Sequence, residues 1–137
     1  MNLVFLDASA IIYLLEGKSK VRQAARQMLA GMRSKNAEPA IVVSALSRLE
    51  CRVQPIRNRD QSKIELFDRF FADPGLHIVQ LSPGVIEQAA HLRANHGLKT
   101  PDALQAACTL ELAEEPPFLT GDSDFRKIRN LDVHLIQ

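Results

Sequence analysis

The stretch NLVFLDASAIIYLLEG, residues 2–17, decides which fold this chain can adopt. Its first five residues form a short apolar run with branched and aromatic side chains, which is typical of a buried β-strand. The apolar run then stops at Asp7, and the pattern from Ser9 to Leu15 is that of an amphipathic helix. A carboxylate at the end of a buried strand requires a compensating group. The nature of that group is the first question about function.

The same two patterns recur along the chain. Further short apolar runs, typical of strands, occupy residues 40–43, 76–81, 117–120 and 133–136. Amphipathic segments lie between them and predict helices over Val21–Met32, Ser44–Arg52, Gln61–Phe71, Val85–His96 and Pro101–Leu112. Strands that alternate with helices favour a mainly parallel sheet covered on both faces, and right-handed crossovers complete the arrangement. We therefore expect an α/β fold, a three-layer α/β/α sandwich with a central five-stranded sheet.

Length and composition favour one globular domain over residues 1–137. With 46% hydrophobic and 24% charged residues, the chain can form a core and is not of the disordered type. The first fifteen residues lack a basic leader and a cleavage site, and no apolar run could span a bilayer. We read Cys51 and Cys108 as core residues of a reduced, cytoplasmic protein. A net charge of +1 does not by itself identify a nucleic-acid partner.

Four acidic residues follow strands or begin the helices after them. Asp7 follows the first strand and Asp122 follows the fourth. Glu50 falls in the second turn of the helix after the second strand, and Asp102 falls in the first turn of its helix. In open parallel sheets, ligands bind beyond the carboxyl ends of the strands. These four side chains are therefore candidates for a shared cleft.

The helix starts near these acids also have recognisable capping patterns. Ser44 is the expected N-cap of the helix that carries Glu50. In the helix that carries Asp102, Thr100 is the expected N-cap, and Pro101 suits the first helical position. Local explanations exist for every acid: Asp7 and Asp122 as helix caps, Asp102 as a complement to the helix dipole, and Glu50 as the partner of Ser47 in a capping box. Caps alone do not predict that the four acids converge.

Convergence of carboxylates has an energetic consequence. Two carboxylates about 4 Å apart repel by roughly 4 kcal/mol at an effective dielectric constant of 20. A divalent cation would compensate this repulsion, and oxygen ligands suit Mg²⁺ or Mn²⁺ better than Zn²⁺. Such a site suits phosphodiester hydrolysis, in which one of the acids can orient or deprotonate the attacking water. The residues do not show which acid has that role.

The order of these motifs resembles the PIN domain family, and within it the small VapC-type ribonuclease toxins. The matching pieces are VFLDASAII, VVSALSRLE, LKTPDALQAACTL and FLTGDSDF, and together they cover the whole chain. The resemblance implies that Asp7, Glu50, Asp102 and Asp122 bind Mg²⁺ or Mn²⁺ and that water cleaves RNA, leaving a 5′-phosphate and a 3′-hydroxyl.

The resemblance also implies supporting residues and partners. Ser9 and Thr120 look like the hydroxyl residues that line such sites. Asp124 would hold a metal-bound water or cap the turn before Phe125, and Gly121 stands where the family often has Asn. The implied partners are an RNA substrate, a second copy of the chain in a homodimer, and a cognate antitoxin whose other domain binds operator DNA.

Other Mg²⁺-binding α/β proteins fit the sequence less well. Haloacid-dehalogenase-type phosphatases need a second Asp two residues after the first, where this chain has Ser9. Receiver domains need an Asp after the third strand, and residues 76–84 contain none. The alternative that keeps the fold is a non-catalytic module that binds RNA or protein, and the four intact acids argue against it.

Overall fold

The computed structural model describes residues 2–33 and 37–137, which fold into five strands, six α-helices and a short 3₁₀ helix, η1. The elements in chain order are β1 (Leu3–Leu6), α1 (Ala8–Glu16), α2 (Ser19–Gly31), β2 (Ala40–Ser44), α3 (Ala45–Arg57), α4 (Gln61–Phe71), β3 (His77–Val79), α5 (Pro83–His96), α6 (Thr100–Leu110), β4 (Phe118–Thr120), η1 (Ser123–Lys127) and β5 (Val133–Leu135). All five predicted strands and all six predicted helices are present.

The sheet is parallel throughout, with strand order β3-β2-β1-β4-β5. The chain builds the sheet outward from β1, first through β2 to β3 and then, on the other side, through β4 to β5. The connections that leave β1 and β4 therefore diverge, and the crevice at such a reversal is where open α/β sheets bind ligands. Strand β1 is the central strand, and Asp7 lies at its carboxyl end.

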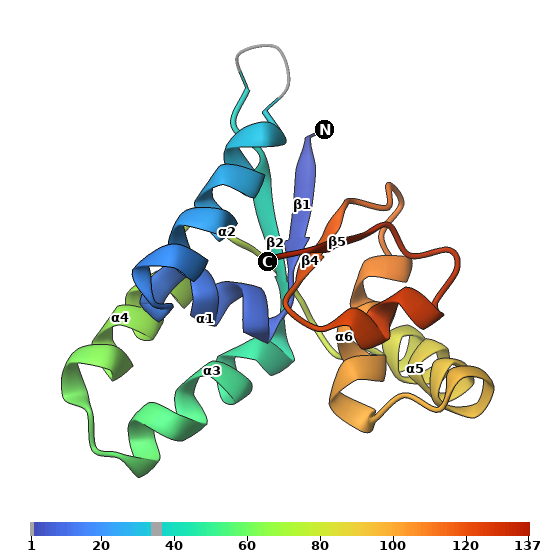
Figure 1. The fold of residues 1–137 in the computed structure, drawn as a ribbon. Coiled ribbons are helices and arrows are strands. Elements are labelled where there is room, and N and C mark those ends of the chain that lie inside the picture. Colours follow the sequence, from blue (N-terminus) through green and yellow to red (C-terminus); the bar gives the residue numbers. More distant parts are fainter. Residues whose placement is uncertain (1, 34–36) are drawn as a thin grey trace.

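Helices cover both faces of the sheet, which confirms the three-layer prediction (Figure 1). On one face, Val4, Leu6 and Leu119 pack with buried residues of α1, α2, α3 and α4. On the other face, Phe5 and Phe118 pack with buried residues of α5, α6 and η1. The alternation of Val4, Phe5 and Leu6 follows from the two-residue period of a strand.

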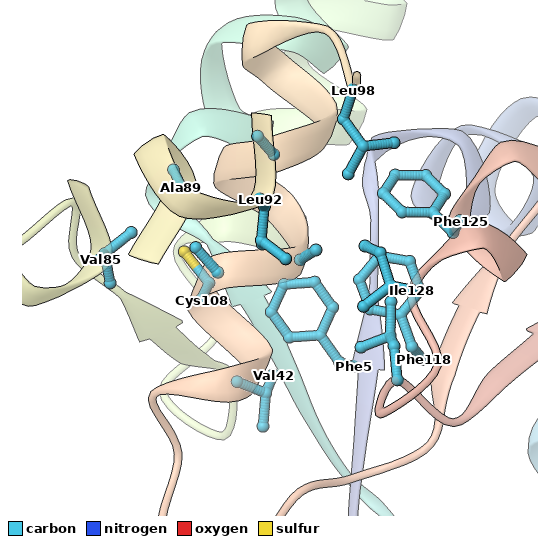
Figure 2. Packing of buried hydrophobic residues seen from close by; sticks show 14 residues of the cluster. Phe5, Val42, Val85, Ala89, Leu92, Leu98, Cys108, Phe118, Phe125 and Ile128 are labelled. Carbon is cyan, nitrogen blue, oxygen red and sulfur yellow. The ribbon is translucent and has the colours of Figure 1, made fainter. Parts of the chain in front are cut away.

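An aromatic group closes the α5–α6 side of the core (Figure 2). The rings of Phe5 and Phe118 stack with centroids 5.2 Å apart, and Phe125 of η1 packs on Phe118 at 4.7 Å. Since Phe125 comes three residues after Asp122, this contact fixes the segment that follows β4. The core thereby positions the acidic turn of residues 121–124.

Most helix boundaries differ from the predictions by one or two residues, and the end of α3 differs by more. Helix α3 continues to Arg57, beyond the predicted end at Arg52, and contains Pro55. Proline costs a hydrogen bond there, but Pro55 is buried and α3 packs along α4, so packing offsets the loss. Helix α6 ends at Leu110, two residues before the predicted end.

Both cysteines are buried and free, one in each core, as predicted. Burial raises the pKa of the Cys51 thiol, which makes it a poor nucleophile. Within residues 2–33 and 37–137, no helix is both long enough and apolar enough to cross a bilayer.

Candidate active site

The candidate site lies where the carboxyl ends of β1 and β4 meet. The backbone N–H of Asp7 donates to the carbonyl of Leu119 at 3.2 Å, which joins the end of one strand to the other. Helices α1 and α3 begin at this same edge of the sheet, as does α6 on the opposite face (Figure 1). This arrangement gathers Asp7, Asp102 and Asp122 at one end of the molecule and brings the second turn of α3 towards them.

Asp7 is held rigidly by three hydrogen bonds. One carboxylate oxygen, Oδ1, accepts from the backbone N–H of Ala10 at 2.9 Å and from the hydroxyl of Ser9 at 2.7 Å. The other, Oδ2, accepts from the hydroxyl of Thr120 at 2.5 Å. Asp7 is therefore the N-cap of α1, and these donors supply part of the compensation that its charge requires.

The hydrogen bonds do not fully compensate the burial of Asp7, whose exposed fraction is only 4%. Burial raises the pKa of Asp7 from 3.8 to about 6, although its three donors act in the opposite direction. The charge of Glu50 adds to the increase. Burial thus makes the ionised form of the Asp7 carboxylate energetically unfavourable, and a cation beside it would stabilise that form.

Ser9 and Thr120 connect Asp7 to the acidic turn after β4. Besides donating to Asp7, the Ser9 hydroxyl accepts from the backbone N–H of Gly121 at 2.9 Å. The Thr120 hydroxyl accepts from the N–H of Asp122 at 3.0 Å. Both hydroxyls therefore lie beside Asp7 and link it to residues 121 and 122.

Gly121 lies close to the side chain of Tyr13. A Cβ atom there would lie 2.9 Å from the hydroxyl oxygen of Tyr13 and closer still to its ring. The backbone of Gly121 is not left-handed, so the constraint on a larger side chain comes from the Tyr13 ring and not from φ. The Asn that the family often has would displace Tyr13 here.

Glu50 projects from α3 and is held by a residue that the sequence reasoning did not single out. The side-chain amide of Gln105, on α6, donates to Oε1 of Glu50 at 2.8 Å. Burial raises the pKa of Glu50, the hydrogen bond from Gln105 lowers it, and the charge of Asp102 raises it further. The capping box with Ser47 does not form, because Ser47 lies inside α3 and its hydroxyl accepts from the same Gln105 amide at 2.8 Å.

Asp102 lies in the first turn of α6, as predicted. Burial raises the pKa of Asp102, the charge of Asp122 raises it further, Lys99 lowers it, and Asp124 adds a smaller increase. The predicted N-cap was wrong by one residue. Lys99 occupies that position without a side-chain cap, while the hydroxyl of Thr100 accepts from Arg93 at 2.6 Å.

Asp122 and Asp124 form a tight local turn. Asp122 is the N-cap of η1, and its carboxylate accepts from the backbone N–H of Asp124 at 2.9 Å. Ser44 caps α3 in the same way through the N–H of Leu46. The local capping roles proposed for Asp7 and Asp122 are thus present, together with the gathering of acids that caps alone do not predict.

The acids form a continuous series of electrostatic neighbours. The charge of Glu50 contributes to the raised pKa of Asp7, and the charge of Asp102 contributes to that of Glu50. The charges of Asp122 and Asp124 contribute to the raised pKa of Asp102. In the described part of the chain, however, no three carboxylate, His or Cys side chains are close enough to hold a metal ion directly. The structure brings the acids together as like-charged neighbours and does not form a closed ligand cage.

This donor set fits a hard divalent cation that keeps part of its water shell. Mg²⁺ is usually bound through one or two carboxylates and several waters, so a closed cage is not required. Burial and, to a smaller extent, neighbouring acids raise the pKa values of Glu50 and Asp102, and a cation would stabilise the ionised form of both. Oxygen-only donors also argue against zinc.

Comparisons with known proteins agree with this fold. A model of the PIN domain family matches residues 4–131. No curated protein sequence matches the chain. Similar solved structures include the Mycobacterium tuberculosis toxin VapC20, which cleaves the sarcin–ricin loop, with 16% identity, a TM-score of 0.76, and coverage of 96% of this chain and 98% of that one.

Two toxin–antitoxin complexes are similar to the same extent. One, from Klebsiella pneumoniae, has 21% identity, a TM-score of 0.72 and 98% coverage of both chains. The other, VapBC2 from Rickettsia felis bound to a promoter DNA fragment, has 16% identity, a TM-score of 0.73, and coverage of 98% of this chain and 100% of that one. These identities show a shared fold. The family model covers most of the sequence, and the chain therefore belongs to the PIN domain family.

Proposed function

We propose that this protein is a divalent-metal-dependent endoribonuclease and the toxin of a toxin–antitoxin pair. The observation that carries the proposal is the series of like-charged acids around buried Asp7, at the reversal point of the sheet. Buried carboxylates with a raised pKa, such as Asp7 at about 6 beside other acids, cluster at functional sites. Similarity to the nuclease toxin VapC20 supports RNA as the substrate class.

The proposed metal is Mg²⁺ or Mn²⁺, held directly by one or two of the carboxylates of Asp7, Glu50, Asp102 and Asp122 and by the others through its waters. When bound, such an ion lowers the pKa of a coordinated water and neutralises charge that develops on a phosphate. Asp7 contributes a fixed carboxylate, because Ser9, Thr120 and the N–H of Ala10 hold it in one orientation.

The remaining side chains would position the RNA and the water. Lys99 is exposed and close enough to Asp102 to lower its pKa, so it can contact a phosphate of the substrate. Asp124 is exposed on the turn after Asp122 and is available to orient a water molecule. Residues 1–137 would constitute one nuclease domain.

The partner proposal has its own structural support. Leu49, Val53 and Ile56 of α3 are 60%, 41% and 51% exposed, and their spacing places them on one face of the helix. Arg48 and Arg57 belong to the same helix. An amphipathic helix with acidic side chains, supplied by an antitoxin, would complement this surface. A homodimer, and operator DNA bound through the antitoxin, are further proposals from the family resemblance.

The nuclease proposal is tested by incubating purified protein with end-labelled total RNA in Mg²⁺, in Mn²⁺ and in EDTA. We expect cleavage with either metal and none in EDTA. An Asp7→Asn variant purified in the same way is expected to be inactive, which excludes a contaminating nuclease. If wild type and variant are equally inert with both metals, the chain is a non-catalytic binding module and the proposal is wrong.

A further inference from the structure

Gln105 is a buried polar residue in an otherwise apolar part of α6. Its exposed fraction is 2%, and Ala103, Ala106 and Ala107 around it belong to the core. Both hydrogens of its amide are used on α3, one on the Ser47 hydroxyl and one on Oε1 of Glu50, each at 2.8 Å. Gln105 therefore links α6 to α3 inside the protein.

The orientation of the Gln105 amide follows from these partners. If the amide were reversed, its oxygen would face the carboxylate of Glu50, and two acceptors would be in contact. The observed orientation leaves the amide oxygen, Oε1, buried and without a hydrogen-bond partner among the described residues. An apolar side chain of similar volume would avoid that unfavourable group. It would also leave the buried Ser47 hydroxyl and the Glu50 carboxylate without their donor, so the contribution of this glutamine lies in its hydrogen bonds to α3.

The position of Gln105 explains what its amide can do. It follows Asp102 by three residues on α6, so the two side chains lie on adjacent turns of one face. Glu50 on α3 and Asp102 on α6 are both acids, and the bond from Gln105 joins their two helices, so their like charges repel when both are ionised. Glu50 is only half-buried, and repulsion would turn a free side chain towards solvent. The hydrogen bond from Gln105 opposes that movement.

We propose that Gln105 is a positioning residue that holds the Glu50 carboxylate beside Asp102, so that the two acids are available to the same divalent ion. This inference rests on the proposed function, because it assumes that Glu50 is a ligand. Gln105 itself contacts neither the ion nor the substrate. It acts by keeping one ligand in place before the ion binds.

The test is a calorimetric titration of the full-length, metal-free protein with Mn²⁺ at fixed pH and salt. Gln105→Met, which keeps the volume and removes the amide, is expected to weaken Mn²⁺ binding by about tenfold to a hundredfold. The matched control is Thr109→Val. Thr109 lies one turn later on α6, is buried, and also has an unpartnered polar atom. This control should bind Mn²⁺ as the wild type does.

A double-mutant cycle separates positioning from a general effect on the fold. If Gln105 acts through Glu50, Gln105→Met should weaken binding no further in a Glu50→Gln background. The melting temperature of metal-free Gln105→Met should stay close to that of the wild type, because removing the unpaired oxygen offsets the loss of the bonds to Ser47 and Glu50. Should Gln105→Met not fold, Gln105→Asn, whose amide is one carbon too short to reach Glu50, is expected to show the same loss of binding.

The outcomes distinguish this proposal from the proposed function. Wild-type affinity in Gln105→Met, or an equal loss of affinity in the Glu50→Gln background, would overturn the role of Gln105 while leaving the metal site intact. A wild type that binds no Mn²⁺, or a Glu50→Gln variant that binds it normally, would instead remove the metal site or Glu50 from it. The proposed role of Gln105 would then also be wrong, because it assumes that Glu50 is a ligand of the ion.

Discussion

Asp102→Asn is expected to reduce metal-dependent RNA cleavage by at least about 100-fold while the protein stays folded. The carboxylate of Asp102 lies between Glu50 on one side and Asp122 and Asp124 on the other in the series of acids. Its charge would contribute to holding an ion that supplies several kcal/mol of charge stabilisation in the transition state. Asparagine keeps the size of the side chain and removes that charge.

The same substitution should not harm the metal-free fold. Because burial and the neighbouring acids raise the pKa of Asp102, removing its charge relieves desolvation and repulsion, and the melting temperature in EDTA should stay equal or rise. Added Mg²⁺ should raise the melting temperature of the wild type more than that of the variant. Asp73→Asn is the control, because exposed Asp73 precedes β3 and lies at the opposite edge of the sheet. Full activity in Asp102→Asn would remove this residue from the site.

Asp7→Asn is expected to change how the stability of the metal-free protein depends on pH. The pKa of Asp7 is about 6 in the folded state against 3.8 for a model carboxyl, so the folded state binds this proton more tightly. The contribution of Asp7 to stability is therefore complete below pH 3.8 and is lost as the pH rises through about 6. The difference of about two pKa units corresponds to about 3 kcal/mol.

The measurement is urea unfolding in EDTA between pH 4 and pH 8 for wild type and Asp7→Asn. Comparing the two proteins isolates Asp7, since Glu50 and Asp102 titrate in both. The wild type should lose up to about 3 kcal/mol more than the variant over this range. At pH 7.5 the variant should then be more stable by about 1–3 kcal/mol, because the asparagine amide can still bond Ala10, Ser9 and Thr120. If the free energy of unfolding depends on pH in the same way for both proteins, burial does not raise the pKa of Asp7.

The fold was predictable because each element carries its own local pattern. Short apolar runs and amphipathic segments showed every strand and helix, and their alternation indicated a parallel sheet. The end of α3 was not predictable, because Pro55 is tolerated only through packing against α4. The start of α6 was missed by one residue, because Thr100 bonds Arg93 instead of capping the helix.

The candidate site was predictable only in part. Chain order placed Asp7, Asp102 and Asp122 near the carboxyl edge of the sheet, since each follows a strand or begins a helix. The bond between Gln105 and Glu50 joins residues 55 positions apart, and no local pattern indicates such a pair. The one available signal was a glutamine among alanines, three residues after an acid on the same helix face.

The groups that compensate the buried charge of Asp7 were also only partly predictable from the sequence. From the sequence, a metal ion was the expected compensating group. The structure adds the hydroxyl of Thr120, which is 113 residues away in the chain and adjacent only because β1 pairs with β4. Yet the pKa of Asp7 remains raised despite these bonds, so they leave a role for a cation.

The most direct test of the proposed metal centre is a crystal soaked in Mn²⁺, with anomalous diffraction data collected to locate the ion. The account predicts a peak at the carboxyl ends of β1 and β4, bounded by Asp7, Glu50, Asp102 and Asp122, which disappears in an Asp102→Asn crystal. Absence of a peak there, or a peak elsewhere on the protein that is unaffected by the substitution, would contradict the proposal that these acids form a metal site.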